Sequence, residues 1–291
     1  MENFIKLLFF LPLSLFALGG VPEVVSGSAT YELTGLHETV RVTDKTILQY
    51  QTFNLEKNHR VTFDQPNSKS TLLCRITGSD PSFIRGHIGA NGRLLFINPN
   101  GIVFSKTAKI NVGSLIASTL NIQNEDFIND RFRFTLSPEA QSSFLIHQGE
   151  IKADENVVLM ASNLRREGVV KAKMEALLGG EVIALDFDGD KKMSFSIEEP
   201  LKRGGIELGG EFGAKEIYVK LETARKMIGL VLQTDGVIEA NKISIENGVV
   251  RLIENQKISL TSPQGILSIE APKFIRKDKS NLRALFTTKL I

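Results

Sequence analysis

One short phrase returns four times along this 291-residue chain and limits how it can fold. The phrase is glycine, any residue, isoleucine or valine, any residue, alanine, and it stands at 86–90, 149–153, 168–172 and 236–240. The successive starts lie 63, 19 and 68 residues apart, which suits one unit, or about three units, of roughly twenty residues. This period predicts a solenoid, in which each unit packs mainly on its neighbours.

The residue types indicate which solenoid to expect. Beyond residue 30 the apolar residues mostly alternate with other residues, as they do from Ile84 to Ala90 and from Ala108 to Val112, and alternation is typical of half-buried strands. Short runs of Ile, Val, Leu and Phe, with turns rich in Gly and Asn, predict an all-β parallel β-helix. The alternative is an antiparallel sandwich of equal strand content, which the irregular spacing between 172 and 236 favours.

The first twenty residues resemble a targeting segment. Leu7 to Leu18 is an apolar run interrupted only by Pro12 and Ser14, and it stops at Gly19-Gly20. This length fits a signal-peptide core and is short of the about 20 apolar residues of a spanning helix. Small residues at Ala17 and Gly19 predict cleavage after Gly19, so that residues 1–19 are a signal peptide. The alternative is a buried amino-terminal helix.

Composition excludes several classes of function. Lysine and arginine total 35 against 33 acids, and a formal charge of +2 gives no overall field for a phosphate backbone, so no nucleic-acid binding is expected. The single cysteine, Cys74, cannot form an internal disulfide or a Cys-rich zinc site, and we expect a core or edge thiol. The four histidines are widely separated in sequence, and no metal or cofactor is predicted.

Two turn signals punctuate the stretch from Gly86 to Phe104. Asn91-Gly92 is a pair that tolerates positive φ and predicts a tight turn. In Asn98-Pro99-Asn100-Gly101, the proline restricts φ to about −65°, the second asparagine can enter the left-handed region, and the glycine can hold a positive φ without steric cost.

An ordered series of segments surrounds this second turn. INPNGIVF (97–104) follows VTFDQPNS (61–68) and RITG (75–78), and precedes VGSLIASTL (112–120) and ALDFDGDKKMSFSI (184–197). The series covers roughly Tyr31 to Pro200 and resembles the filamentous-haemagglutinin-like secretion domain of two-partner secretion exoproteins. The resemblance implies a right-handed parallel β-helix that is capped at its amino end and recognised by a dedicated outer-membrane transporter. We therefore expect a signal peptide at 1–19, a secretion domain at 20–200, and further coils with a basic tail at 201–291.

The resemblance also suggests where such a protein acts. It implies a product that crosses the periplasm of a Gram-negative bacterium and becomes secreted or cell-surface bound, most plainly an adhesin that contacts a host surface receptor or glycan. The candidate recognition element is the pair of turns, Asn98, Pro99, Asn100 and Gly101 with Asn91 and Gly92. The alternative is that these residues only shape the turns. About ninety residues follow Pro200, where such exoproteins commonly carry a far longer passenger, so a truncated module without its passenger stays a second interpretation. Many members have a second Asn-Pro motif that bears on the transporter contacts, and Gln65-Pro66-Asn67 is the only other Pro-Asn pair here.

A secreted parallel β-helix can also be a polysaccharide lyase or hydrolase. Such a site needs carboxylates from adjacent coils on one face, and no such pattern is visible, so we predict no catalytic residue. Asp186-x-Asp188-x-Asp190 resembles the start of a calcium loop, but Lys191 and Ile197 stand where an EF-hand needs Gly and Glu. We expect a tight turn there, with Gly189 at its tip. The basic segment 273–289 predicts either a solvated tail or contact with an anionic surface.

Overall fold

The computed structural model describes residues 19–187, 193–202, 204–208, 211–214 and 216–221, and seven later strands between Gly229 and Arg276. Apart from Gly19, the expected signal peptide lies outside these residues. The described part is almost entirely β-structure, with one short α-helix, α1 (Asn124–Ile128), and one 3-10 helix, η2 (Pro138–Ser142). In the same part, no helix has the length and apolar character needed to cross a membrane.

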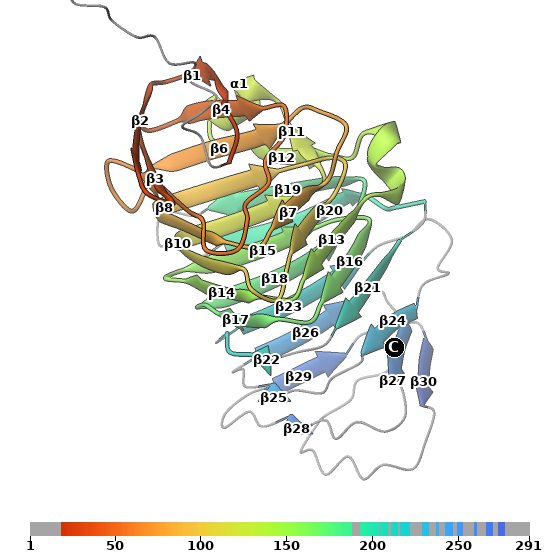
Figure 1. Cartoon of the computed structure of the whole chain (residues 1–291). Helices are drawn as coiled ribbons and strands as arrows, with labels where there is room; N and C mark the ends of the chain where they lie inside the picture. Colours follow the sequence, from red (N-terminus) through yellow and green to blue (C-terminus); the bar gives the residue numbers. More distant parts are fainter. Residues whose placement is uncertain are drawn as a thin grey trace, which may run out of the picture.

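The strands form three files of parallel pairs that run the length of the molecule (Figure 1). The first file contains β3 (His37–Val42), β5 (Arg60–Asp64), the first halves of β8 (His87–Ile97) and β10 (Lys109–Ser118), β14 (Glu150–Ala153), β17 (Val169–Lys171), β22 (Glu211–Phe212), β25 (Val237–Ile238) and β28 (Ser259–Leu260).

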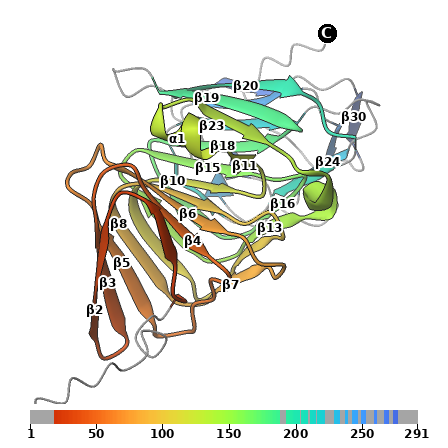
Figure 2. The same ribbon diagram turned by 90° about the horizontal axis from the view of Figure 1, so that it is seen from above.

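The second and third files complete each coil. The second contains β4 (Thr46–Tyr50), β6 (Thr71–Ile76), the second halves of β8 and β10, β15 (Asn156–Met160), β18 (Met174–Gly179), β23 (Glu216–Leu221), β26 (Lys242–Glu246) and β29 (Ile266–Ile269). The third contains β7 (Ser82–Ile84), β9 (Ile102–Phe104), β13 (Phe144–His147), β16 (Asn163–Arg166), β21 (Gly205–Leu208), β24 (Gly229–Leu232), β27 (Val249–Leu252) and β30 (Lys273–Arg276). Figure 2 shows the first file on the left and β13 and β16 of the third on the right. The predicted right-handed parallel β-helix is confirmed, and the antiparallel sandwich is wrong.

The repeated phrase marks one inward column of the first file. Its central residues Ile88, Ile151 and Val170 are aligned in register, with Ile110 between the first two, and all four are buried. The step from Ile88 to Ile110 and the step from Ile151 to Val170 each span one plain coil, whose length agrees with the predicted period. These three repeats therefore place an aliphatic side chain directly over one of the previous coil.

The number of coils in the long intervals was predicted wrongly. Lys109 pairs directly with Glu150, and Val169 pairs directly with Glu211, so each of these two coils is about twice as long as a plain one. The long intervals between repeats therefore each span two coils rather than three. The reason is that each long coil contains an excursion from the solenoid. The first excursion forms β11 (Asn121–Ile122), α1, β12 (Phe132–Thr135) and η2, and the second forms β19 (Val182–Phe187) and β20 (Met193–Glu199).

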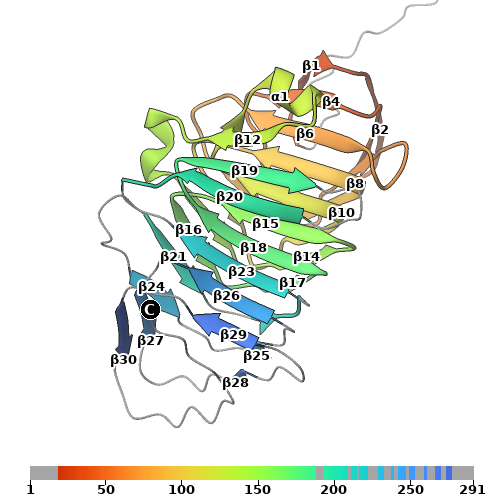
Figure 3. The same ribbon diagram turned by 180° about the vertical axis from the view of Figure 1, so that it is seen from behind.

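The two excursions join in a four-stranded antiparallel sheet in the order β11-β12-β19-β20, here called the excursion sheet. Figure 3 shows it lying over the second file. Strands β6, β15 and β18 of that file are buried at every position, which fits strands that are covered on both faces. The excursions thus cover one side of the solenoid with residues far apart in the sequence.

The first strands also depart from parallel pairing. β1 (Glu23–Ser26) runs antiparallel to β4, and β2 (Ala29–Thr34) runs antiparallel to β3. That they act as an amino-terminal cap stays a prediction. The interior beside them is aromatic, with the Phe53 ring 5.1 Å from that of Phe96. Cys74 is a fully buried core thiol aligned with Phe96, and burial raises its pKa.

Candidate functional site

The turn from Asn98 to Gly101, here called the Asn98 corner, leads the chain from β8 to β9 and so from the second file to the third. Asn98 Oδ1 accepts a hydrogen bond from the Asn100 amide at 2.9 Å, and the Gly101 amide donates to the Asn98 carbonyl at 3.1 Å. Gly101 has φ of 126°, as predicted, whereas Asn100 does not enter the left-handed region. The positive φ favours glycine at Gly101, and a Cβ there would also lie a tight 3.3 Å from the ring of Phe144 in the next coil.

Asn98 bonds to the preceding coil through its side chain and to the following coil through its backbone. Its Nδ2 donates to the Ser82 hydroxyl and to the Asp80 carbonyl, both at 3.0 Å, and its backbone amide donates to the Ser118 carbonyl at 3.0 Å. The residue is fully buried. Because the side-chain amide of Asn98 is enclosed and hydrogen-bonded, its contribution is to hold the turn in place.

Asn100 and Pro99 form the outer part of the corner, and both are half-buried. Asn100 Nδ2 donates to the carbonyl of Gly78 at 2.6 Å, which ties the corner to the loop before β7. Ser79 and Asp80 in that loop are exposed. The corner therefore presents a small polar surface built from two successive coils.

The tight turn predicted at Asn91-Gly92 is wrong. Both residues lie inside β8, neither has a positive φ, and the strand passes there from pairing with β5 to pairing with β6. The side chain of Asn91 exchanges two hydrogen bonds with the backbone of Gln65, each 2.7 Å long, and the Gly92 amide donates to Gln65 Oε1 at 3.1 Å. These hydrogen bonds take the place of backbone hydrogen bonds between strands at this point of β8. The chain thereby passes from the first file to the second without reversing its direction.

Gln65 was missed as a member of this site. It is 3% exposed, and its Nε2 donates to the Ser70 carbonyl at 2.8 Å and to the Arg93 carbonyl at 3.2 Å. The sequence signal that could have indicated Gln65 is its position, as a polar residue directly after a strand and before Pro66. Its bonds to Asn91 and Gly92 join successive coils, so they could not be found from local spacing.

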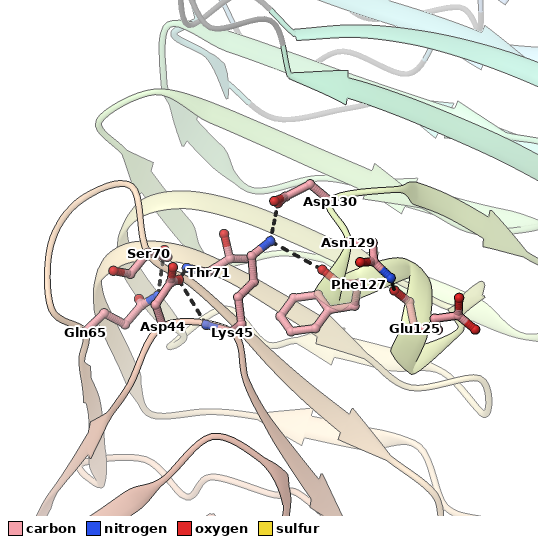
Figure 4. Close-up of polar contacts among 9 residues, drawn as sticks. All are labelled: Asp44, Lys45, Gln65, Ser70, Thr71, Glu125, Phe127, Asn129 and Asp130. Atoms are coloured by element: carbon pink, nitrogen blue, oxygen red, sulfur yellow. Dashed lines mark hydrogen bonds and ion pairs between the residues drawn. The ribbon is translucent and has the colours of Figure 1, made fainter.

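Lys45 connects the first coil to the first excursion (Figure 4). Asp44 Oδ1 accepts hydrogen bonds from the Lys45 amide at 2.9 Å and from the Thr71 amide at 2.8 Å, which fixes the turn before β4. The Lys45 ammonium pairs with Asp130, donates to the Phe127 carbonyl at 3.3 Å, and lies 5.4 Å from the centre of the Phe127 ring. The excursion is thereby attached to the amino-terminal end of the solenoid.

Arg93 makes the corresponding contact from β8. Its guanidinium carbon lies 3.8 Å from the centre of the Phe187 ring and 5.5 Å from that of Phe132, so it touches both excursions. Burial lowers the pKa of Arg93, and the aromatic faces offset part of the lost hydration. The sequence did not reveal this cluster because its members are distant in the chain.

A polar layer interrupts the apolar interior farther along. Arg166 Nε lies 3.0 Å from Glu175 Oε1 and Arg166 Nη2 lies 3.2 Å from Glu175 Oε2, with both side chains fully buried. His147 precedes Arg166 in the same column, and its ring centre lies 6.3 Å from that of Phe104. Burial, with a smaller contribution from the Arg166 charge, lowers the pKa of His147 to about 3. We call these three residues the polar layer.

Most of the candidate calcium loop lies outside the described residues. Asp186 lies in β19, whereas Asp188, Gly189 and Asp190 are outside the described residues, so the tight turn stays a prediction. Among the residues that the structure describes, no group of three or more His, Cys, Asp or Glu side chains is arranged to hold a metal ion.

The chain matches known proteins in sequence and in fold. A sequence model of the TPS secretion domain matches residues 31–269 of this chain. Two curated relatives, both heme/hemopexin-binding proteins of Haemophilus influenzae, are 26% identical over 271 residues and 25% identical over 256 residues. The matches cover 90% and 79% of this chain but 30% and 27% of those proteins, so this chain corresponds to less than a third of their length.

Two solved structures have the same architecture. The crystal structure of the HMW1 secretion domain from Haemophilus influenzae matches with a TM-score of 0.67 and 25% identity, covering 89% of this chain and 71% of that one. The filamentous hemagglutinin secretion domain matches with a TM-score of 0.53 and 16% identity, covering 94% of this chain and 95% of that one. At that identity, the second likeness shows the fold alone.

Proposed function

Because this chain belongs to the family of TPS secretion domains, we propose that it directs the export of an exoprotein through a dedicated outer-membrane transporter. The match over residues 31–269 is the observation that carries this proposal. The exoprotein crosses the periplasm of a Gram-negative bacterium after its signal peptide is removed, and it is then released or kept at the cell surface.

The solenoid suits export through a narrow pore. Each coil packs on the previous one through aligned columns such as Ile88, Ile110 and Ile151, so the first coil to emerge offers a surface on which the next can fold. Burying these columns outside the cell biases movement outward without nucleotide hydrolysis at the outer membrane. The attachment of Lys45 to Phe127 and Asp130 supports this order, because the first coil provides the docking site for a later excursion.

Within this role the two asparagines of the Asn98 corner act differently. Asn98 and Gly101 shape the turn, since one is fully buried and the other needs a positive φ. Pro99 and Asn100, with their half-exposed surfaces, are the residues we assign to transporter recognition. Strand addition is the second contact mode, because β2 pairs with β3 alone among the described strands and leaves one edge free.

Export in a heterologous Gram-negative host tests these assignments. The chain is expressed with and without an outer-membrane transporter of the two-partner type, and secreted protein is measured in the medium, while the melting temperature of each purified variant reports folding. Asn100→Ala should reduce export strongly but lower the melting temperature less than Asn98→Ala does, because it removes one half-exposed side-chain hydrogen bond, to the Gly78 carbonyl. Asn98→Ala should reduce both, because it leaves the Ser82 hydroxyl and the Asp80 carbonyl without their donor.

Asn111→Ala is the matched control, because Asn111 is an exposed asparagine on the outward side of β10. It should export like the wild-type chain. Wild-type export of Asn100→Ala would remove Asn100 from recognition, and transporter-independent export of the wild-type chain would contradict the function itself.

For the exported product we propose adhesion, with a host surface receptor or glycan as partner and no enzymatic activity. The outward positions of stacked parallel strands form a repetitive surface, which suits attachment. The relatives named for binding heme and hemopexin provide the rival function. Binding of the secreted protein to epithelial cells would support adhesion, whereas capture by immobilised hemopexin without cell binding would support the rival. Release of sugar ends from pectin-like polymers would indicate an enzyme.

A further inference from the structure

Four basic side chains stand in line on the outer face of the first file. His37 is aligned with Arg60, Arg60 with His87, and His87 with Lys109, in β3, β5, β8 and β10. The next residue in β8, Ile88, points inward and is 2% exposed, so these four positions face outward. Neighbouring strands are about 4.8 Å apart, which makes this line about 14 Å long. We call it the basic column.

The full positive charges of the basic column are those of Arg60 and Lys109. Within the described part of the chain, Arg60 and Lys109 form no ion pair, although both are exposed. Arg41, on the outer face of the same sheet, is different: it lies 2.8 Å from Glu32 and 3.7 Å from Asp64. Among the described residues, these two cations thus differ from Arg41 on the same face in having no carboxylate within ion-pair distance.

The state of His87 agrees with this charge distribution. Partial burial, followed by the charges of Arg60 and Lys109, holds the pKa of His87 below its ordinary value. The Arg60 guanidinium lies 3.2 Å from His87 Nδ1. At the carboxyl end the column stops at Glu150, the register neighbour of Lys109, whose carboxylate lies 3.6 Å from Lys171.

A column of small polar residues runs beside the basic one. Thr39, Thr62, Gly89 and Asn111 occupy it in successive strands and are aligned in register. Thr62 Oγ1 lies 2.9 Å from His37 Nε2, so the two columns are in contact. Hydroxyl and amide groups at this spacing can exchange hydrogen bonds with sugar hydroxyls, while the small side chains leave the face flat.

We propose that this face binds a linear polyanionic glycan, a chain with sulfate or carboxylate groups along its length, which lies along the solenoid axis. Its acidic groups meet the basic column and its hydroxyls meet the threonine and asparagine column. The two columns contain no Phe, Tyr or Trp, which disfavours single-stranded nucleic acid because bases bind by stacking on such rings. The inference rests on the surface location proposed above and adds a ligand class within the secretion domain itself.

Binding of a heparin-derived decasaccharide to the purified chain tests the proposal. Affinity is measured by calorimetry at two salt concentrations, with dextran as the uncharged comparison. The double variant Arg60→Gln, Lys109→Gln should weaken binding about tenfold or more and should lower its salt dependence. The matched control is Arg41→Gln, Arg133→Gln, which removes the same charge from two exposed arginines that are paired with acids, Arg133 with Glu198 at 2.7 Å. It should stay within about twofold of the wild-type affinity.

Three results would overturn the proposal: wild-type affinity in the Arg60 and Lys109 variant, an equal loss in the control variant, or competition by a single-stranded oligonucleotide that matches the glycan. All substituted side chains are exposed, so both variants should keep the wild-type melting temperature. If the first variant does not fold, the single charge reversal Lys109→Glu replaces it, with the same expected direction. The calorimetry contains no transporter, so a lack of glycan binding would not contradict the export function. A lack of export would likewise not change the affinity for the glycan.

Discussion

One inward column of the second file changes character along its length. Leu72, Leu94, Leu115 and Val157 occupy it in successive coils and are fully buried, and the next residue in register is Glu175, which is equally buried. The third file makes the same kind of change, because His147 and Arg166 follow Phe104 there. The solenoid thus has an apolar region and a polar layer built on the same backbone geometry.

The difference separates two contributions to the fold. Aliphatic stacking is non-directional, so a coil that slipped by two residues could still bury apolar groups. The contact between Arg166 and Glu175 depends on both side chains being at set positions in β16 and β18. We therefore expect aliphatic stacking to contribute stability without selecting one register by itself, and the polar layer to favour one register at a cost in desolvation.

The largest expected effect comes from breaking the polar layer on one side. Glu175→Leu leaves the Arg166 guanidinium buried without its carboxylate, and we expect the free energy of unfolding to fall by about 3–5 kcal/mol. Urea unfolding of the purified chain measures it. Glu207→Gln is the control, because Glu207 lies 3.5 Å from the exposed Arg165 in the same strand as Arg166, and a loss below about 1 kcal/mol is expected. Equal losses of unfolding free energy in the two variants would mean that burial of the ion pair does not add to its effect on stability.

The apolar region should respond to Leu94→Ala in the same column. Leu94 is fully buried between Leu72 and Leu115, and its truncation should cost about 3 kcal/mol through lost burial and the cavity left behind. The same unfolding experiment measures it. A loss below about 1 kcal/mol would show that the coils close around the gap, which would contradict tight packing in this region.

These two regions were not equally visible in the sequence. Alternation and the repeated phrase predicted the parallel strands, because inward residues recur at the coil period, and Asn98-Gly101 was found because proline and glycine restrict local conformation. The polar layer was missed because the Arg165-Arg166-Glu167 run resembles a solvated surface, and only the inward alternation of β16 separates Arg166 from Arg165. Asn91-Gly92 was misread for the opposite reason, since a local turn signal was overridden by bonds to Gln65 in the preceding coil.

The polar layer should also make stability depend on pH through His147. Its pKa is about 3 in the folded chain and about 6.5 when unfolded, so between these values only the unfolded chain binds the proton, and stability falls as pH falls from about 6.5 towards 3. Between pH 7 and pH 5 the loss should be about 2 kcal/mol. His147→Leu should remove this part of the pH dependence while keeping an apolar neighbour for Phe104. An unchanged difference between the two pH values in His147→Leu would contradict the assignment.

The smallest change in stability is expected when the ion pair is replaced as a whole. Arg166→Met with Glu175→Leu removes both charges together, so no buried charge is left alone, and the free energy of unfolding should stay within about 1 kcal/mol of the wild-type value. If the polar layer selects the register, this variant should populate more than one strand register while its free energy of unfolding stays nearly the same. Amide hydrogen exchange should then report weaker protection in β16, β18 and β21 than in β6 and β8. Wild-type protection throughout would show that apolar stacking alone sets the register of these coils.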